Sequence, residues 1–220
     1  MRKVTKVLHE YSNLFPTKFT EMKGIARELG EMRITLKLDA KSMRKRPYRL
    51  NPRYKEKVKI EIAKTLEACI IEPVEESEWI SPMFLQNKKT REIRICVDLK
   101  KLNDACVTDP FPTPFSDEVL DNVGGQEAYP FTDGFSGYHQ IRIAKEDRHK
   151  TMFSIEDGCY QYNVMPFGFK NAKTIFSRVV VVAFREFIHK FLEVYFDDWT
   201  VFGLLQNHVK NIRMMFDRCR

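Results

Sequence analysis

An adjacent pair of aspartates, Asp197 and Asp198, is the feature of this sequence that points most directly to chemistry. The pair lies between two apolar runs, 191–196 and 199–202, and short apolar runs around a two-residue polar step predict a β-hairpin. Aspartate is a poor strand former, and neighbouring carboxylates repel each other. A hard divalent cation such as Mg²⁺ would offset that cost, because it prefers carboxylate oxygens as ligands. The pattern therefore predicts a metal-binding hairpin.

A third aspartate, Asp133, closes another strand-like run at 128–132. Pro130 within that run suits an edge strand or a bulge better than a central strand. Three aspartates at strand ends could hold two metal ions about 3.5–4 Å apart, an arrangement used for in-line phosphoryl displacement. The alternative is that Asp133 caps a turn and that the pair at 197–198 decorates an exposed hairpin.

Four segments, in this order and at this spacing, resemble motifs of the reverse transcriptases. They are RICVDLKKLN at 94–103, FTDGFSGYHQI at 131–141, VMPFGFKNA at 164–172 and YFDDW at 195–199. The combination is most similar to the polymerase of gypsy-type long-terminal-repeat retrotransposons, and KRPYRLNP at 45–52 is similar to the segment that leads into that domain. An aspartate pair alone is a weak signal, but four motifs in order are a strong one.

The mixed order of helices and strands predicts an α+β fold, which the resemblance sharpens to the fingers and part of the palm of a right-hand polymerase. The palm would be a split βαβ, ferredoxin-like sheet. The fingers would comprise 41–107 and 141–170, and the palm 108–140 and 171–220, after an N-terminal lead or linker segment at 1–40. We expect the palm to be truncated at its C-terminus and the thumb to be absent.

The resemblance implies an RNA- or DNA-templated DNA polymerase that adds deoxynucleotides to a primer 3′-end. Asp133, Asp197 and Asp198 would be the catalytic residues and would hold two Mg²⁺ ions, with Mn²⁺ as an alternative. The implied partners are an RNA or DNA template with its primer, and deoxynucleoside triphosphates. One alternative is a catalytically inactive retrotransposon remnant that keeps the fold and binds nucleic acid weakly at most. The order of the motifs disfavours another, a general basic scaffold domain.

Three cations lie on the predicted hairpin that resembles the fingers tip: Lys88, Lys89 and Arg94. Ammonium and guanidinium groups there would cover the incoming triphosphate. The alternative for each lysine is an ordinary solvated surface position, whereas Arg94 directly begins one of the family motifs.

Four further residues are candidates for nucleotide binding. A turn from Gly134 could aim backbone N–H groups at phosphate oxygens. The resemblance implies that Tyr138 lies under the sugar and excludes a 2′-hydroxyl, and that Phe167 and Gly168 shape the pocket beside the nascent base pair. The alternative for Tyr138 is a tyrosine of the core, and the alternative for Phe167 and Gly168 is a strand-to-helix turn with an apolar plug. Lys173 departs from the family, which usually has proline there.

Composition limits the class of protein. Lys and Arg number 37 against 30 Asp and Glu, for a formal net charge of +7, which is compatible with a polyanionic partner. The basic run at 41–49 is either a solvated linker or a phosphate-contact segment. Five scattered cysteines without a CxxC pair favour reduced thiols in an intracellular protein, cytoplasmic or nuclear. We expect neither a membrane span nor a secretory signal, and the sequence leaves the oligomeric state open.

The remaining elements follow from periodicity and from turn residues. We expect Ser116 to be a helix N-cap. Helices are predicted at 4–14, 52–71, 116–123, 171–190 (the longest) and 206–219, and strands at 79–86, 91–98, 151–155 and 159–164.

Overall fold

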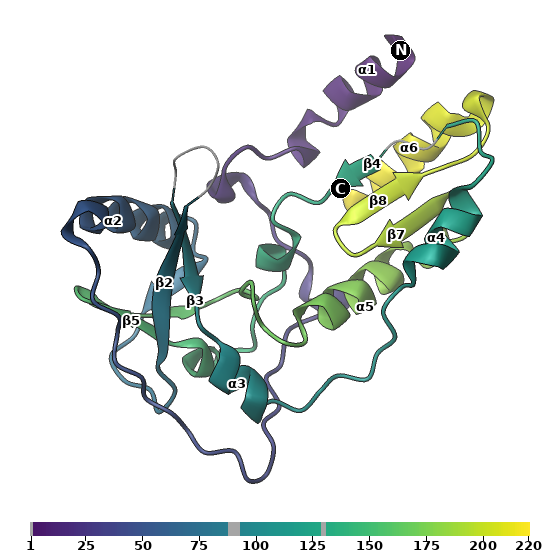
Figure 1. Cartoon of the computed structure of the whole chain (residues 1–220). Coiled ribbons are helices and arrows are strands. Elements are labelled where there is room, and N and C mark those ends of the chain that lie inside the picture. The colour runs from purple at the N-terminus through teal and green to yellow at the C-terminus, as the bar shows by residue number, and fades with distance from the viewer. Residues whose placement is uncertain (1, 88–92, 129–130) are drawn as a thin grey trace. The chain divides into compact units, whose positions relative to one another are not determined.

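The computed structural model describes residues 2–87, 93–128 and 131–220 (Figure 1). Its contacts divide the chain into two compact units, and each is assembled from separate segments. The first unit comprises Met1–Thr17, Pro110–Gly137 and Lys173–Arg220. The second unit comprises Lys18–Asp109 and Tyr138–Ala172.

The second unit is built on a five-stranded sheet with the order β1-β6-β5-β2-β3. Strands β2 and β5 pair in parallel, and every other pair in this sheet is antiparallel. The strands predicted at 79–86, 91–98, 151–155 and 159–164 are confirmed where the structure describes them, whereas the first strand of this sheet was not predicted. The strands are β1 (Ile71–Pro73), β2 (Ser81–Asn87), β3 (Ile93–Val97), β5 (Phe153–Ile155) and β6 (Gly158–Tyr162).

The second unit also contains two α-helices, α2 (Pro52–Glu67) and α3 (Lys100–Ala105), and short 3₁₀ helices. Asn51 caps the start of α2, because its side-chain oxygen accepts a hydrogen bond from the Arg53 N–H at 3.1 Å. Pro52 then occupies the first turn, where its missing N–H costs nothing. The 3₁₀ helices are η2 (Phe19–Glu21), η3 (Arg27–Leu29), η4 (Gly137–Gln140) and η5 (Lys145–Thr151).

Helix α2 ends in a Schellman motif. The Cys69 N–H donates to Leu66 O and the Ile70 N–H donates to Thr65 O, each at 2.9 Å. This motif requires a left-handed residue after the helix, and Cys69 has φ 54°. Glycine usually occupies such a position, because a Cβ strains that conformation. The side chain of Ile70 is buried and completes the apolar contact typical of the motif.

The basic segment that precedes α2 is held to the second unit by its backbone. The Lys45 N–H donates to Ile80 O at 3.0 Å, and the Ile80 N–H donates to Met43 O at 2.8 Å. The ammonium of Lys45 also lies 3.3 Å from the carboxylate of Asp98. At this point the segment is therefore part of the packed unit.

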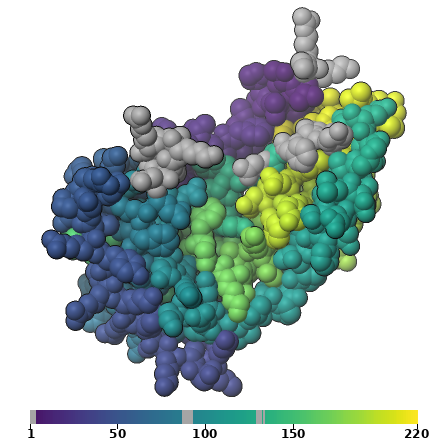
Figure 2. All heavy atoms as spheres, viewed as in Figure 1, coloured from purple at the N-terminus to yellow at the C-terminus, as the bar shows by residue number. Residues whose placement is uncertain are grey.

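The first unit is built on a three-stranded antiparallel sheet with the order β4-β8-β7. Helix α4 packs on β7, and their regions are neighbours in the space-filling view (Figure 2). The elements are α1 (Arg2–Glu10), the 3₁₀ helix η1 (Ser12–Leu14), α4 (Ser116–Val123), β4 (Phe131–Asp133), α5 (Ala172–Phe184), β7 (Leu192–Tyr195), β8 (Asp198–Val201) and α6 (Leu205–Cys219).

The two terminal helices of the chain, α1 and α6, pack together in the first unit. The rings of Tyr11 and Phe216 are 5.3 Å apart, and the Tyr11 hydroxyl donates to Asp217 at 2.5 Å. Arg213 donates two hydrogen bonds, of 2.7 and 2.6 Å, to the carboxylate of Glu10. Those bonds hold the pKa of Glu10 below its usual range.

Several helix predictions were wrong in their bounds: the helix predicted at 52–71 ends at Glu67, with Ile71 already in β1, and the helix predicted at 4–14 ends at Glu10. Helix α5 ends at Phe184, so α2, with 16 residues, is longer than α5, with 13. Ser116 is the first residue of α4 rather than its N-cap, because the extended residue before the helix is Phe115. The Ser116 hydroxyl therefore does not cap the helix. Asp117 and Glu118 supply favourable negative charge to the first turn.

Replacing Cys69 with glycine should stabilise the protein. Glycine adopts the left-handed conformation without strain, so we expect the free energy of unfolding of Cys69→Gly to rise by about 0.5–1 kcal/mol. Urea unfolding followed by circular dichroism measures it. The matched control is Cys159→Gly within β6, which removes the same side chain from a strand and should lower stability. A Cys69→Gly protein no more stable than the parent would contradict this account of the helix end.

Candidate functional site

The hairpin that carries the aspartate pair turns one residue earlier than its sequence predicts. Tyr195 pairs with Asp198, so the two-residue turn consists of Phe196 and Asp197. Phe196 has φ 53°, as the first position of a type II′ turn requires. Glycine is usual there, and a bulky residue in this conformation costs roughly 1–3 kcal/mol. Asp198 consequently begins β8 and is exposed, whereas Asp197 lies in the turn and is half-buried.

Pairing between β4 and β8 brings the third aspartate to the same place. The register sets Asp133 opposite Asp198. The N–H of the next residue, Gly134, donates to the backbone oxygen of Asp197 at 3.2 Å. The structure therefore gathers the backbone of all three predicted aspartates at one end of the sheet in the first unit. The side chain of Asp133 is outside the described part of the structure.

The turn after β4 is tightly packed around Gly137. A Cβ at this position would lie 2.8 Å from the ring of Phe176 and 3.7 Å from Oδ1 of Asp197. The carboxylate of Asp197 therefore lies close to this backbone, and only glycine fits without displacing the Phe176 ring. Sequence reasoning missed Gly137, although a glycine four residues after a candidate metal ligand was a usable signal.

The predicted phosphate-binding turn is corrected in one respect. Gly134 uses its N–H for Asp197 O, and Gly137 uses its N–H for Gly134 O at 3.2 Å. Both donors are engaged within the protein, so neither can contribute to an anion nest in this conformation.

The donor set at the end of the three-stranded sheet suits Mg²⁺, which takes carboxylate oxygens in preference to nitrogen or sulfur. Among the side chains that the structure describes, no three His, Cys, Asp or Glu residues are close enough to hold an ion. That set excludes the side chain of Asp133, so Asp197 and Asp198 are the described part of the predicted site. The residues fit the metal in type and in backbone register.

Lys173, which departs from the family pattern, lies beside this turn. It occupies the first turn of α5, and its ammonium is 4.9 Å from the centre of the Phe196 ring. A cation over an aromatic face is favourable by about 0.5–1 kcal/mol at an exposed site. This contact supports the strained residue of the turn.

Candidate nucleotide-binding residues of the second unit form an aromatic cluster. The ring of Tyr138 is 5.2 Å from that of Phe167, and the His139 ring is 4.9 Å from Phe167 at 81°. Tyr138 is buried and Phe167 is exposed. Packing of this kind fixes the tyrosine ring while leaving one aromatic face open to a ligand.

Gly168 follows this cluster and is held by a residue that sequence reasoning missed. Gly168 has φ 86°, and nothing lies within 4 Å of a Cβ placed on it, so conformation rather than crowding requires glycine. Asn103 donates to Gly168 O at 2.8 Å and accepts from the Lys170 N–H at 2.7 Å. Asn103 therefore positions this loop; the only sequence signal was its place at the end of the 94–103 motif.

Of the three cations predicted to bind phosphate, the structure describes one. Lys88 and Lys89 lie outside the described residues. Arg94 is exposed on β3, paired with Gln86 of β2. Asp98 is a structural residue: its carboxylate accepts a hydrogen bond from the Lys100 N–H at 3.1 Å, at the start of α3.

His139 is held neutral by its surroundings. Burial lowers the pKa of His139 to about 4, and the positive charge of Arg94 contributes in the same direction. The imidazole therefore behaves as a polar aromatic ring at neutral pH. Its contacts with Phe19 and Phe167 indicate a structural role in packing.

Comparison with known proteins identifies the family. The family model described as reverse transcriptase (RNA-dependent DNA polymerase) matches residues 86–220. The chain belongs to the reverse transcriptase family. It is 36% identical over 159 residues to the Pol polyprotein of the gypsy transposon and 31% identical over 172 residues to that of transposon 412, both from Drosophila melanogaster. It is 33% identical over 195 residues to the enzymatic polyprotein of cauliflower mosaic virus, strain Strasbourg.

The reverse transcriptase chain spans only part of these relatives. The matches cover 69%, 75% and 86% of this chain, but 15%, 14% and 28% of the gypsy, 412 and cauliflower mosaic virus polyproteins, respectively. It is thus related by sequence to RNA-directed DNA polymerases over a small share of much longer proteins.

Solved structures confirm the expected α+β polymerase fold. The foamy viral protease–reverse transcriptase in complex with an RNA/DNA hybrid matches with a TM-score of 0.86 at 21% identity, over 99% of this chain and 29% of that one. The native prototype foamy virus protein gives a TM-score of 0.85 at 20% identity, over the same shares. The chain therefore has the fold of the fingers and palm region. Across the described residues, no helix is long and apolar enough to cross a membrane.

The low pKa of His139 makes stability depend on pH. In the unfolded chain His139 should titrate near its ordinary value of about 6.5. Between about pH 6.5 and 4 the unfolded state binds more protons than the folded state, so stability falls as pH falls through this window. We expect His139→Phe, which keeps an aromatic ring, to lose less stability between pH 7 and pH 5 than the parent.

Chemical denaturation at pH 7, 6 and 5 measures this difference, and NMR titration of the His139 ring gives its pKa directly. Burial also lowers the pKa of His208, in the first unit, so His208→Phe should reduce the pH dependence with the same sign and is a second test of this linkage. Equal pH dependence in the parent and in His139→Phe would show that this imidazole is not held neutral.

Proposed function

We propose that this chain is the polymerase region of a reverse transcriptase, adding deoxynucleotides to the 3′-end of a primer paired with an RNA or DNA template. The observation that carries the proposal is the backbone arrangement of the three aspartates. Asp133 is opposite Asp198 in the sheet, and Asp197 is hydrogen-bonded through its backbone to the residue after Asp133. Family membership supports the reaction class, because the matched family is RNA-dependent DNA polymerase.

In this proposal the first unit is the palm and carries the chemistry. Two Mg²⁺ ions, or Mn²⁺ in their place, held by the three aspartates would lower the pKa of the primer 3′-hydroxyl and neutralise charge on the triphosphate. The protein contributes position: Asp197 lies in the turn directly after the strained residue Phe196, and its Oδ1 lies 3.7 Å from where a Cβ on residue 137 would be. Preorganised negative charge of this kind needs no rearrangement when substrate arrives.

The second unit is the fingers in this proposal and binds the incoming nucleotide. The family resemblance implies that Tyr138 would lie against the sugar and exclude a 2′-hydroxyl, and the contact of its ring with Phe167, with 5.2 Å between centroids, would hold it in place. Phe167 is exposed and offers a face to a base, while Gly168 gives the loop its left-handed turn. Arg94, together with Lys88 and Lys89, would supply positive charge for phosphate.

Nucleic-acid partners are proposed from charge and from related proteins. The chain carries a net charge of +7, which favours a polyanion. The foamy virus relatives are described in complex with an RNA/DNA hybrid and with double-stranded DNA. We therefore propose that a primer–template duplex and deoxynucleoside triphosphates are the substrates of this chain.

Primer extension tests the proposal. With an oligo(dT) primer on poly(rA), labelled deoxythymidine triphosphate and Mg²⁺, we expect incorporation by the parent protein. Asp197→Asn and Asp198→Asn should each reduce the rate by about 100-fold or more, since a metal ligand contributes several kcal/mol to transition-state stabilisation. Asp121→Asn, an exposed change in α4 of the same unit, is the matched control and should leave the rate unchanged.

Chelation with EDTA should abolish incorporation in the parent. Circular dichroism confirms that each variant is folded. A folded parent protein that incorporates nothing at any concentration would favour a non-catalytic remnant. Full activity in Asp197→Asn would exclude the proposed catalytic role of that residue.

Substituting Tyr138 should relax selection against ribonucleotides. We expect Tyr138→Ala to raise the ratio of ribonucleotide to deoxynucleotide incorporation by about tenfold or more, because removal of the ring opens space for a 2′-hydroxyl. Tyr138→Phe keeps the ring and should leave the ratio unchanged. Single-turnover extension rates with each nucleotide give this ratio. A general loss of activity lowers both rates equally and leaves the ratio unchanged. An unchanged ratio in Tyr138→Ala would remove this residue from the sugar-binding role.

A further inference from the structure

A pocket of about 210 Å³ lies within the second unit and shares His139 with the aromatic cluster of Tyr138 and Phe167. One side is formed by the 3₁₀ segment around Phe19 and Lys23, and another by His139 and Arg142. Arg148 and Asn163 complete the polar part of its lining. Its volume is below the roughly 300–1,000 Å³ of pockets for drug-sized ligands, so it suits a small ligand such as one nucleotide unit.

The charge of this pocket is positive. Lys23, Arg142 and Arg148 all line it, and no acidic side chain does so among the residues that the structure describes. Lys23 and Arg142 are exposed, and neither forms an ion pair with any other described residue. The positive charges of these two side chains are therefore available to attract an anionic ligand.

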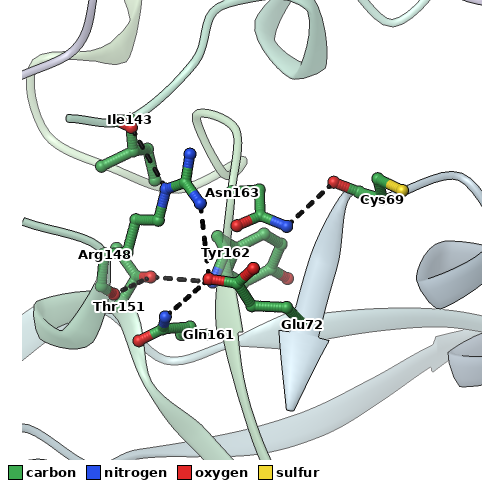
Figure 3. Close-up of polar contacts among 8 residues, drawn as sticks. All are labelled: Cys69, Glu72, Ile143, Arg148, Thr151, Gln161, Tyr162 and Asn163. Carbon is green, nitrogen blue, oxygen red and sulfur yellow. Dashed lines mark hydrogen bonds and ion pairs between the residues drawn. The ribbon is translucent and has the colours of Figure 1, made fainter. Parts of the chain in front are cut away.

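Arg148 is held in position by hydrogen bonds to Ile143 and Glu72 (Figure 3). Its Nε donates to Ile143 O at 3.3 Å, and one terminal nitrogen donates to Glu72 at 3.4 Å. Glu72 also accepts a shorter bond, of 2.8 Å, from Gln161. Burial opposes the charge of Glu72, but these donors outweigh it and lower its pKa. The second terminal nitrogen of Arg148 points away from Glu72 (Figure 3), so the guanidinium retains donors for a ligand.

A hydrogen-bond acceptor in the same lining has no partner. Asn163 donates its amide to Cys69 O at 3.2 Å, which fixes the orientation of the side chain. Its Oδ1 is buried and makes no hydrogen bond to any described residue. A buried acceptor of this kind is costly unless a ligand or water donates to it. A base amino group or a sugar hydroxyl supplies such a donor.

The apolar part of the pocket combines the ring of Phe19 with the aliphatic side chains of Met22, Ala68, Ile70 and Val164. The ring of Phe19 meets that of His139 edge to face, with 5.8 Å between centroids. Ile70 is buried beside them. Flat apolar groups next to cations suit a ligand that combines a planar ring with a negative charge.

We propose that this pocket binds a nucleoside phosphate, with the phosphate against Lys23, Arg142 and Arg148 and the base against Phe19 and His139. The ligand is either an unpaired nucleotide of a strand or a free nucleotide, because the chemistry is the same. Binding in this pocket requires neither catalysis nor a metal ion. A protein that fails to bind the nucleotide here can therefore be distinguished from a protein that fails to extend a primer.

Equilibrium binding in EDTA tests the proposal without contribution from a metal site. The probe is fluorescein-labelled single-stranded octathymidylate, followed by anisotropy, with unlabelled thymidine monophosphate as competitor. We expect Lys23→Ala/Arg142→Ala to weaken binding of the probe about tenfold and to reduce the salt slope of log K by about 1–2, as loss of phosphate contacts does. The matched control, Arg33→Ala/Lys57→Ala, removes the same charges from exposed positions outside the pocket and should change affinity less than about twofold.

Cys69 reports the location of the ligand, because it lines the pocket and is exposed. We expect 10 mM thymidine monophosphate to slow alkylation of Cys69 by iodoacetamide, measured by peptide mass spectrometry, without slowing that of Cys159 in β6. Displacement of the probe by the monophosphate assigns the pocket to free nucleotide, and protection of Cys69 by the oligonucleotide alone assigns it to an unpaired strand.

Three outcomes would overturn the proposal. Equal weakening by the pocket pair and the control pair would mean general electrostatic attraction only. Equal protection of Cys69 by inorganic phosphate would remove the nucleoside from the assignment. Absence of protection by either nucleotide ligand would place any binding elsewhere.

Discussion

The antiparallel register between β4 and β8 is the constraint on which the candidate active site depends. It sets Asp133 opposite Asp198, and like charges directly opposite each other destabilise a sheet. The hairpin adds a second cost, because Phe196 adopts a conformation that glycine prefers. A sequence selected for stability alone would avoid both. Costs of this kind persist where surrounding packing imposes them and where function uses them.

The surroundings of the turn show how these costs are offset. The Gly134 N–H bonds to Asp197 O, the Phe176 ring fills the space beside Gly137, and the ammonium of Lys173 lies over Phe196. Each contact is worth roughly 0.5–1.5 kcal/mol, comparable to the strain of one residue. The lysine is notable because a cation in the first turn of a helix is unfavourable for the helix dipole. At this position it instead contributes positive charge near an acidic turn.

Sequence pattern predicted the type of most elements, because alternation and capping residues act locally. The exact turn at 196–197 was not predictable, since nothing in Tyr195-Phe196-Asp197-Asp198 marks phenylalanine as the left-handed residue. Cys69 is a similar case: its conformation follows from how α2 ends. The role of Asn103 was also hidden, because its partners are more than 60 residues away in sequence.

The division into two units could be predicted only from family resemblance. Each unit joins segments that are distant in the chain, and no composition change marks the crossing points near 17, 110, 138 and 173. In the first unit the terminal helices illustrate this, since Glu10 and Arg213 pair across 203 positions. Exposed ion pairs contribute little, about 0–1 kcal/mol, so the aromatic packing of Tyr11 on Phe216 stabilises this contact more.

His139 joins two parts of the second unit through packing rather than charge. One edge of its ring contacts Phe19 in the basic pocket, and the ring also contacts Phe167 of the aromatic cluster. Burial disfavours a protonated imidazole at His139, and the positive charge of Arg94 adds repulsion in the same direction. The neutral ring avoids that repulsion.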